Sequence, residues 1–186
     1  MGETLGKSQQ IPNSFLESQH FLESLQNPNS FPRISAEFHP PKKWVLERAL
    51  SYQSDEIDDR ALEAVGVKCP GNKITCKKGF TTDLASTPKL LWNVIAPWDI
   101  ARAAIIHDLL YLRIRQYRAK NRGLNHGKID MKIVKKSKKA ADNVFLLAMK
   151  DASPSVPNWK IYAAYYAVVL CGRWSIIPRE GDNEQM

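Results

Sequence analysis

The chain has 186 residues and a net charge of +8, with 44% hydrophobic and 25% charged residues. This composition is typical of a globular protein, and the length suits one domain with an appendage or one large domain. No apolar run approaches the ~20 residues that span a bilayer, and the N-terminus lacks the basic and apolar regions of a signal peptide. The three cysteines have no paired-ligand spacing, which argues against a disulfide framework or a zinc site and favours a reducing compartment.

Most of the positive charge lies in residues 113–139, which hold eleven basic residues and one acidic residue, a net +10. Such a segment can bind the phosphates of anionic lipids or of nucleic acid. The simpler alternative is that these residues are solvated side chains of a loop and of the helix ends beside it. An anionic membrane surface is one candidate partner, and nucleic acid is less favoured because no nucleic-acid motif accompanies the charges. The residues predicted to bind anionic surfaces are Arg113, Arg115, Arg118, Lys135 and Lys136.

Residues 1–39 are predicted to form a polar N-terminal arm that is extended or ordered by a partner. The arm contains an amphipathic segment at 14–25, which is too short to be a stable helix alone because isolated helices under ~12–15 residues are marginal. Its apolar residues need a surface, either on this chain or on a neighbouring subunit. A single globular domain is predicted over 40–177, followed by a polar tail at 178–186.

The first half of this domain predicts a small β element. Residues 44–51 favour a strand, although a helix is a competing prediction for so short a run. A Pro-Gly-Asn turn at 70–72 precedes a β-prone run at 73–76. The acidic stretch 54–66 between them is predicted to be a loop or a short helix.

The second half predicts helices. We expect Asp99 to cap the longest of them, and Gly172 to end the last as the left-handed residue that often follows a helix. The fold class is therefore mainly α with a small β element, an α+β domain with three or four helices. The predicted helices are 89–95, about 99–117, 137–151 and 159–170.

The stretch 101–111, ARAAIIHDLLY, is the most informative part of the chain. On a helix His107 and Tyr111 share one face, since residues four apart are neighbours. Asp108 lies ~100° away around the axis, so it can serve the same site as His107 without bonding to it. A histidine on an apolar helix is often a core residue with a satisfied hydrogen bond, and this alternative stays open here.

Three segments form a recognisable order along the chain: GFTTDLASTP at 79–88, AAIIHDLLY at 103–111 and KAADNVF at 139–145. Together they resemble a family of unknown function that is common in tailed-phage genomes and prophages. The resemblance covers about residues 44–174. It implies a bacteriophage protein located in the virion or in the host cytoplasm.

The second and third of these segments also resemble the active-site helices of phospholipase A₂-like enzymes. The resemblance implies an antiparallel helix pair with His107 as general base, Asp142 as the carboxylate that orients it, and Tyr111 in support. It further implies Ca²⁺ as a cofactor, with Asp108 as a ligand. The glycine-rich calcium loop of those enzymes is missing, so Asp83 is a substitute ligand or simply bonds backbone amides.

Three hypotheses for the function follow. The first is a lipid-ester hydrolase with a phospholipase A₂-like His–Asp site. The second is a non-enzymatic virion component, such as a tail or neck protein, whose buried polar network joins two helices and whose arm binds other virion proteins. The third is a nucleic-acid-binding accessory factor that uses the basic segment.

Overall fold

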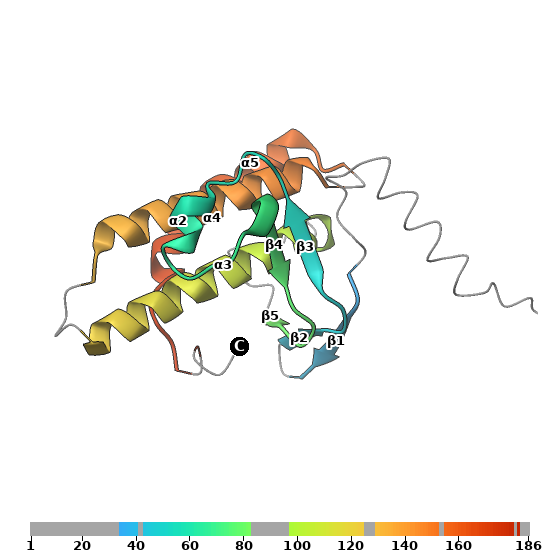
Figure 1. The fold of residues 1–186 in the computed structure, drawn as a ribbon. Coiled ribbons are helices and arrows are strands. Elements are labelled where there is room, and N and C mark those ends of the chain that lie inside the picture. Colours follow the sequence, from blue (N-terminus) through green and yellow to red (C-terminus); the bar gives the residue numbers. More distant parts are fainter. Residues whose placement is uncertain are drawn as a thin grey trace, which may run out of the picture.

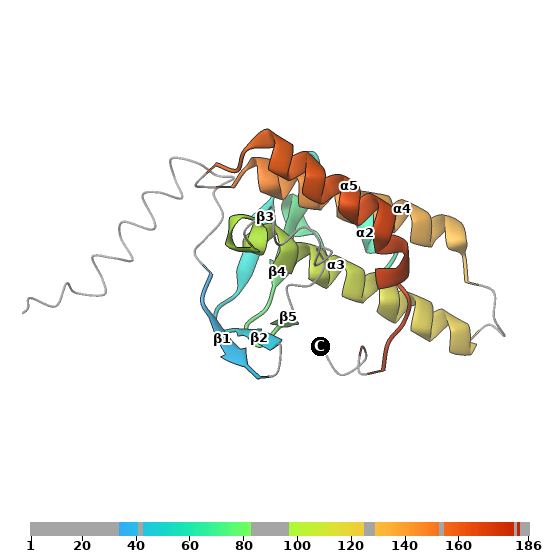
Figure 2. The same cartoon turned by 180° about the vertical axis from the view of Figure 1, so that it is seen from behind.

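The computed structural model describes residues 34–40, 43–82, 97–124, 129–152, 155–180 and 182. Within them, the long helices α3 (Pro97–Leu124), α4 (Met131–Lys150) and α5 (Asn158–Ser175) pack with a short helix and two small antiparallel sheets. Figure 1 shows α3 and α4 side by side, with the strands gathered beside the N-terminal part of α3. Seen from behind, α5 lies along α4 (Figure 2). The expected fold class, α+β and mainly helical, is confirmed.

Helices α3 and α4 are both longer than their sequence patterns predicted. Helix α3 begins at Pro97, where a missing backbone N–H has no cost, so Asp99 lies inside the helix and its prediction as N-cap is wrong. Helix α4 begins six residues before the predicted start at 137. Its cap is Asp130, whose carboxylate accepts hydrogen bonds from the backbone N–H groups of Lys132 (2.8 Å) and Ile133 (3.4 Å).

Helix α5 continues past Gly172, so the prediction that this glycine ends the helix is wrong. Gly172 is buried against α3, where an added Cβ would overlap the Tyr111 hydroxyl and lie 3.1 Å from Tyr111 Cζ. The glycine is therefore required by the close approach of two helices rather than by helix termination.

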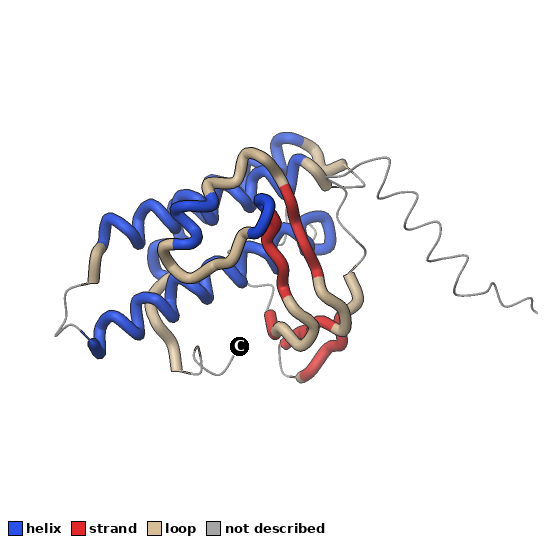
Figure 3. The backbone as a smooth tube through the Cα atoms, in the orientation of Figure 1, coloured by secondary structure: helices blue, strands red, loops and turns tan. Residues whose placement is uncertain are grey.

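The strands form two sheets (Figure 3). One has the order β1 (Ala36–His39), β2 (Lys43–Leu46), β5 (Thr81–Thr82), and the other pairs β3 (Leu50–Gln53) with β4 (Lys73–Cys76). The predicted strand at 73–76 is confirmed.

The single strand predicted at 44–51 is wrong, because a bend at the exposed Glu47 and Arg48 divides it into β2 and β3. The buried residues Leu46 and Leu50 flank this bend and enter the core from different sheets. The short helix expected within 54–66 is α2 (Asp59–Glu63), which is capped by Asp58.

Two of the predicted segments are described only in part or not at all. The last residues of the predicted arm form β1, which pairs with β2, while residues 1–33 lie outside the described residues. The helix predicted at 89–95 also lies outside them.

None of the described helices has the length and hydropathy needed to cross a membrane. One hydrophobic core joins the β3–β4 sheet, α2 and the three long helices, and it surrounds His107.

We predict that Gly172→Ala destabilises the fold. The new methyl group would push against a Tyr111 ring whose hydroxyl is fixed by a hydrogen bond to Asp142 (2.6 Å). Overpacking of this kind costs about 1–3 kcal/mol, against a gain of ~1 kcal/mol in helix propensity. Urea unfolding should therefore give a lower free energy of unfolding than in the parent.

The matched control is Cys171→Ala, an exposed position on the same helix that should change stability little. Tyr111→Phe in the Gly172→Ala background should recover part of the loss, because it removes the overlapping oxygen. A Gly172→Ala protein at least as stable as the parent would contradict this account of the glycine.

Candidate functional site

A buried carboxylate, Asp142 on α4, is the centre of the candidate site. Its Oδ1 lies 3.2 Å from His107 Nε2 and accepts a 2.6 Å hydrogen bond from the Tyr111 hydroxyl, both from α3. Its Oδ2 accepts a 2.6 Å hydrogen bond from Lys138 Nζ, one turn earlier on α4. The structure thus brings together the three residues predicted to be catalytic, His107, Tyr111 and Asp142, and their catalytic roles stay predictions.

The site is enclosed by the core. His107 is 0% exposed, Tyr111 2% and Asp142 3%. The rings of Tyr111 and Phe145 lie with centroids 4.0 Å and 5.0 Å from that of the imidazole. These apolar contacts remove water from the side of the imidazole that the rings cover, which strengthens each hydrogen bond to Asp142.

His107 is neutral in this environment. Burial lowers the pKa of His107 below its ordinary value of 6.5, and this outweighs the opposite effect of the Asp142 carboxylate. An ionised carboxylate can only accept, so Nε2 carries the proton and donates a hydrogen bond to Asp142. Nδ1 then holds a free lone pair, and among the residues that the structure describes no group hydrogen-bonds to it.

Asp142 is ionised. Burial alone would raise the pKa of Asp142, but the hydrogen bonds from His107, Lys138 and Tyr111 together lower it below 3.8. Lys138 supplies the countercharge. Burial beside this carboxylate also raises the pKa of the Tyr111 hydroxyl, which therefore stays protonated and donates.

Two residues of this site were missed by the sequence analysis. Lys138 pairs with Asp142 at the i, i+4 spacing typical of helical ion pairs, so the Lys-x-x-x-Asp pattern could have indicated it. Lys138 Nζ also donates to the Val169 carbonyl of α5 at 3.3 Å, which links the network to a third helix. The sequence around Gly172 did not indicate its contact with the site, because that contact depends on the approach of α5 to Tyr111.

Of the two predicted metal ligands, the structure describes Asp108 alone. Asp108 lies on another side of α3 from His107 and accepts a hydrogen bond from the Thr82 hydroxyl, while Asp83 lies outside the described residues. The described residues contain no group of three or more His, Cys, Asp or Glu side chains placed to hold a metal ion. Because Asp83 lies outside the described residues, calcium binding at Asp108 and Asp83 stays a prediction.

The five residues predicted to bind anionic surfaces have different surroundings. Arg115 binds the Asp182 carboxylate at 2.9 Å, and Arg118 donates to the Ile176 carbonyl at 2.6 Å, so both hold the C-terminal segment against α3. Lys135 and Lys136 are exposed on α4. Arg113 lines a cavity on another side of α3. Anion binding by this set stays a prediction, and Arg115 and Arg118 already have partners within the chain.

We predict that His107 makes stability depend on pH. Unfolded chains protonate histidine below about pH 6.5, whereas burial keeps the folded imidazole neutral, so stability falls as the pH is lowered through this range. His107→Gln should reduce this slope by up to about 1.4 kcal/mol per pH unit, the value for one proton. Urea unfolding between about pH 7.5 and about pH 5 measures the slope.

The control for this measurement is His39→Gln, which removes an exposed histidine of β1 outside the core. Equal slopes for the parent and His107→Gln would show that the imidazole protonates as readily in the folded state as in the unfolded one.

Comparison with known proteins identifies a protein family for this chain. No curated protein and no solved structure matches the chain. A family model described as a protein of unknown function, DUF1353, matches residues 59–168. The matched region runs from α2 into α5 and includes His107, Tyr111 and Asp142. On this evidence the chain belongs to DUF1353, a protein family of unknown function.

Proposed function

We propose that the chain is a phage-encoded lipid-ester hydrolase in which His107 is the general base. One observation carries the proposal: Nε2 of a neutral imidazole is held by a carboxylate, while Nδ1 has no hydrogen-bond partner in the described residues. An unsatisfied buried polar atom costs about 1–3 kcal/mol, and a catalytic role is one of the few reasons for a protein to keep one.

The chemistry assigned to these side chains is general-base hydrolysis. Nδ1 takes a proton from a water molecule while the water oxygen bonds to the ester carbonyl carbon. The Asp142 carboxylate fixes the tautomer and stabilises the imidazolium that forms, and Tyr111 and Lys138 hold the carboxylate in place. The proton then passes to the alcohol oxygen as the ester C–O bond breaks, which yields a fatty acid and an alcohol.

The exposed side of α5 supports a lipid substrate. Trp159, Tyr166, Leu170 and Trp174 are 56–70% exposed and recur at helical spacing along this helix. Basic groups accompany them: Lys160 Nζ lies 5.9 Å from the centre of the Trp159 ring, and the Arg173 guanidinium lies 4.0 Å from that of Trp174. Tryptophan and tyrosine beside cations suit the interface of an anionic membrane, which we propose as the partner of this α5 face.

A second candidate function is favoured by the burial of the site. His107 is 0% exposed, and the network joins α3, α4 and α5 through Asp142 and Lys138. A buried polar network that joins several helices favours one packing of those helices. In this alternative the chain is a virion tail or neck component, and residues 1–39 bind a neighbouring subunit.

Replacing the histidine separates the two candidates. If His107 is the general base, His107→Ala should lower the rate of phospholipid-ester hydrolysis by 10²–10⁴-fold, the usual contribution of a positioned base, while the protein remains folded. The measurement is fatty-acid release from phospholipid vesicles, with and without added calcium, together with thermal unfolding. His39→Ala at an exposed position is the control and should retain the parental rate.

The structural alternative predicts a different pair of results. The parent would release no fatty acid in either calcium condition, and His107→Ala would lower stability by about 1–3 kcal/mol because Asp142 loses a donor. That combination would reject the hydrolase. Release that persists in His107→Ala would reject this histidine as the base.

The proposed membrane surface has its own test. Leu170→Glu places a negative charge in the middle of the α5 face and should weaken binding to anionic vesicles at least tenfold, as judged by vesicle sedimentation. Met131→Glu adds the same charge at an exposed residue where α4 begins and is the matched control. Equal binding by both variants would remove α5 as the contact.

A further inference from the structure

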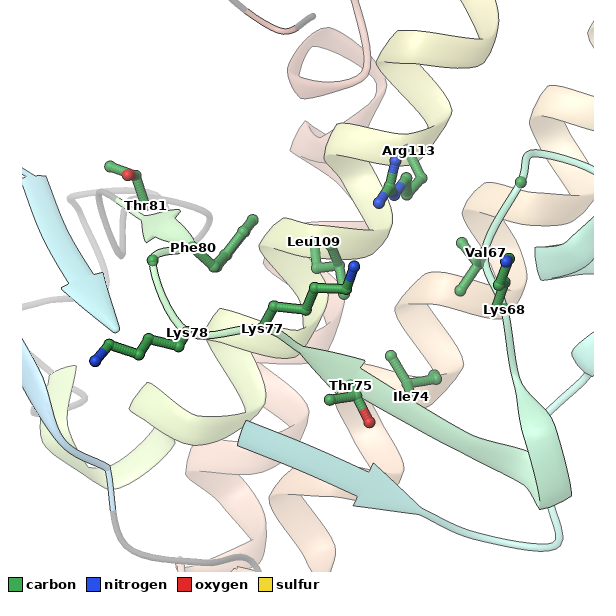
Figure 4. A pocket seen from close by; sticks show the side chains of 12 residues that line it. Val67, Lys68, Ile74, Thr75, Lys77, Lys78, Phe80, Thr81, Leu109 and Arg113 are labelled. Carbon is green, nitrogen blue, oxygen red and sulfur yellow. The ribbon is translucent and has the colours of Figure 1, made fainter. Parts of the chain in front are cut away.

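A cavity of about 490 Å³ opens beside α3 (Figure 4). Its walls come from the segment after α2, the end of β4 with the turn that follows it, and the middle of α3. Cavities of this size hold small molecules in other proteins. Leu109 and Arg113, one turn apart on α3, line it, whereas His107 lies ~200° around the helix axis from Leu109. The cavity is therefore separate from the candidate catalytic site.

The described lining residues carry positive charge only. They include four basic residues and no acidic one, and they come from three separate segments of the chain: Lys68, Lys77, Lys78 and Arg113. In Figure 4 the Lys77 side chain extends past Leu109 toward Arg113, while Lys78 points away from them. We call the group formed by Lys68, Lys77 and Arg113 the basic cluster.

No residue of the basic cluster forms an ion pair with another residue that the structure describes. The ion pairs of the described chain use other cations, such as Arg115 and Lys138, each of which has its own carboxylate. Arg113 donates to the neutral Gln116 side chain at 3.0 Å. Like charges around one cavity repel each other, and an anion bound between them would remove this cost.

The remaining lining residues indicate what else the ligand contains. Val67, Ile74 and Leu109 are buried core residues whose side chains face the cavity, and Phe80 packs beside them. Thr75 and Thr81 also line the cavity, and the Thr75 hydroxyl is paired with that of Ser51 at 2.9 Å. An apolar wall opposite cations fits a molecule with an apolar or aromatic part and an anionic head.

We propose that this cavity binds a small organic phosphate. The phosphate lies between Lys77 and Arg113, where its two negative charges are matched and the guanidinium can form paired hydrogen bonds. The apolar part of the ligand packs against Leu109 and Phe80. This proposal does not depend on the hydrolase, because no residue of the cavity contacts His107 or Asp142 through a hydrogen bond in the described residues.

Calorimetric titration of the full chain with phenyl phosphate tests the proposal. We expect saturable binding that weakens when the salt concentration rises from about 0.05 M to about 0.5 M, since salt screens exposed charges. Inorganic phosphate should bind more weakly because it lacks the aromatic part, and phenol should not bind measurably because it lacks the charge. Saturable binding of phenol as tight as that of phenyl phosphate would overturn the role of the basic cluster.

Charge-matched variants locate the site. The double variant Lys77→Gln with Arg113→Gln should weaken phenyl phosphate binding at least tenfold, as expected from the loss of charge-assisted hydrogen bonds. Arg48→Gln with Lys150→Gln removes the same charge from exposed positions at the β2–β3 bend and on α4 and should change binding less than twofold. Equal losses of affinity in both double variants would show that net charge alone determines binding, and this would overturn the proposal. Lys68→Gln, on the other wall, provides the same test should the first double variant not fold.

Vesicles distinguish a soluble ligand from a lipid headgroup with the same chemistry. Phosphatidic acid presents a phosphate monoester on a membrane, and phosphatidylcholine vesicles are the control without it. Binding of phenyl phosphate that the Lys77→Gln, Arg113→Gln variant loses supports the proposal, whether or not phosphatidic acid vesicles also bind. Binding to the vesicles or to duplex DNA without any binding of phenyl phosphate would overturn a small-molecule site.

Discussion

The buried charge of Asp142 is the constraint on which the helical part of the structure depends. A carboxylate that is 3% exposed is tolerated only when donors surround it, and here they come from Lys138, Tyr111 and His107. Removing Lys138, the ionic partner, would leave an uncompensated buried charge, which typically costs about 3–5 kcal/mol. The hydrogen bonds from His107 and Tyr111 join α3 to this carboxylate of α4. Lys138 carries the constraint to α5 through the Val169 carbonyl, and the Tyr111 hydroxyl leaves room only for glycine at 172.

Helix α3 separates two different polar environments. On the side facing α4, His107 and Tyr111 are buried and both lie within hydrogen-bond distance of one anion, Asp142. On the other side, Leu109 and Arg113 face an open cavity lined by cations that form no ion pair with a described residue. One helix serves both because residues four apart share a face and residues two apart lie on nearly opposite faces. A ligand in the cavity and a substrate at His107 would thus contact the same rigid element.

The sequence predicted those features that depend on local pattern. The spacing of His107 and Tyr111 gave one helix face, and the resemblance supplied Asp142 as the partner on the next helix; both residues now lie within hydrogen-bond distance of Asp142. Features that depend on tertiary contacts were not predicted. A glycine near a helix end usually terminates the helix, but Gly172 instead allows α5 to lie close to Tyr111 of α3. Arg115 was predicted to bind anionic surfaces, but it forms an ion pair with Asp182, which is distant in the sequence.

The choice of histidine at position 107 bears on the function of the network. Asp142 already has Lys138 as its countercharge and Tyr111 as a second donor, so an ion pair with two hydrogen bonds would remain without the imidazole. An apolar side chain at 107 would pack against Phe145 and would leave no unpaired acceptor such as Nδ1 in the core. Replacing a poorly satisfied polar group by an apolar one of similar shape is often neutral or stabilising. A network selected only for helix packing therefore gains little from a histidine here, and local rules of this kind are usually broken where a protein has a function to perform.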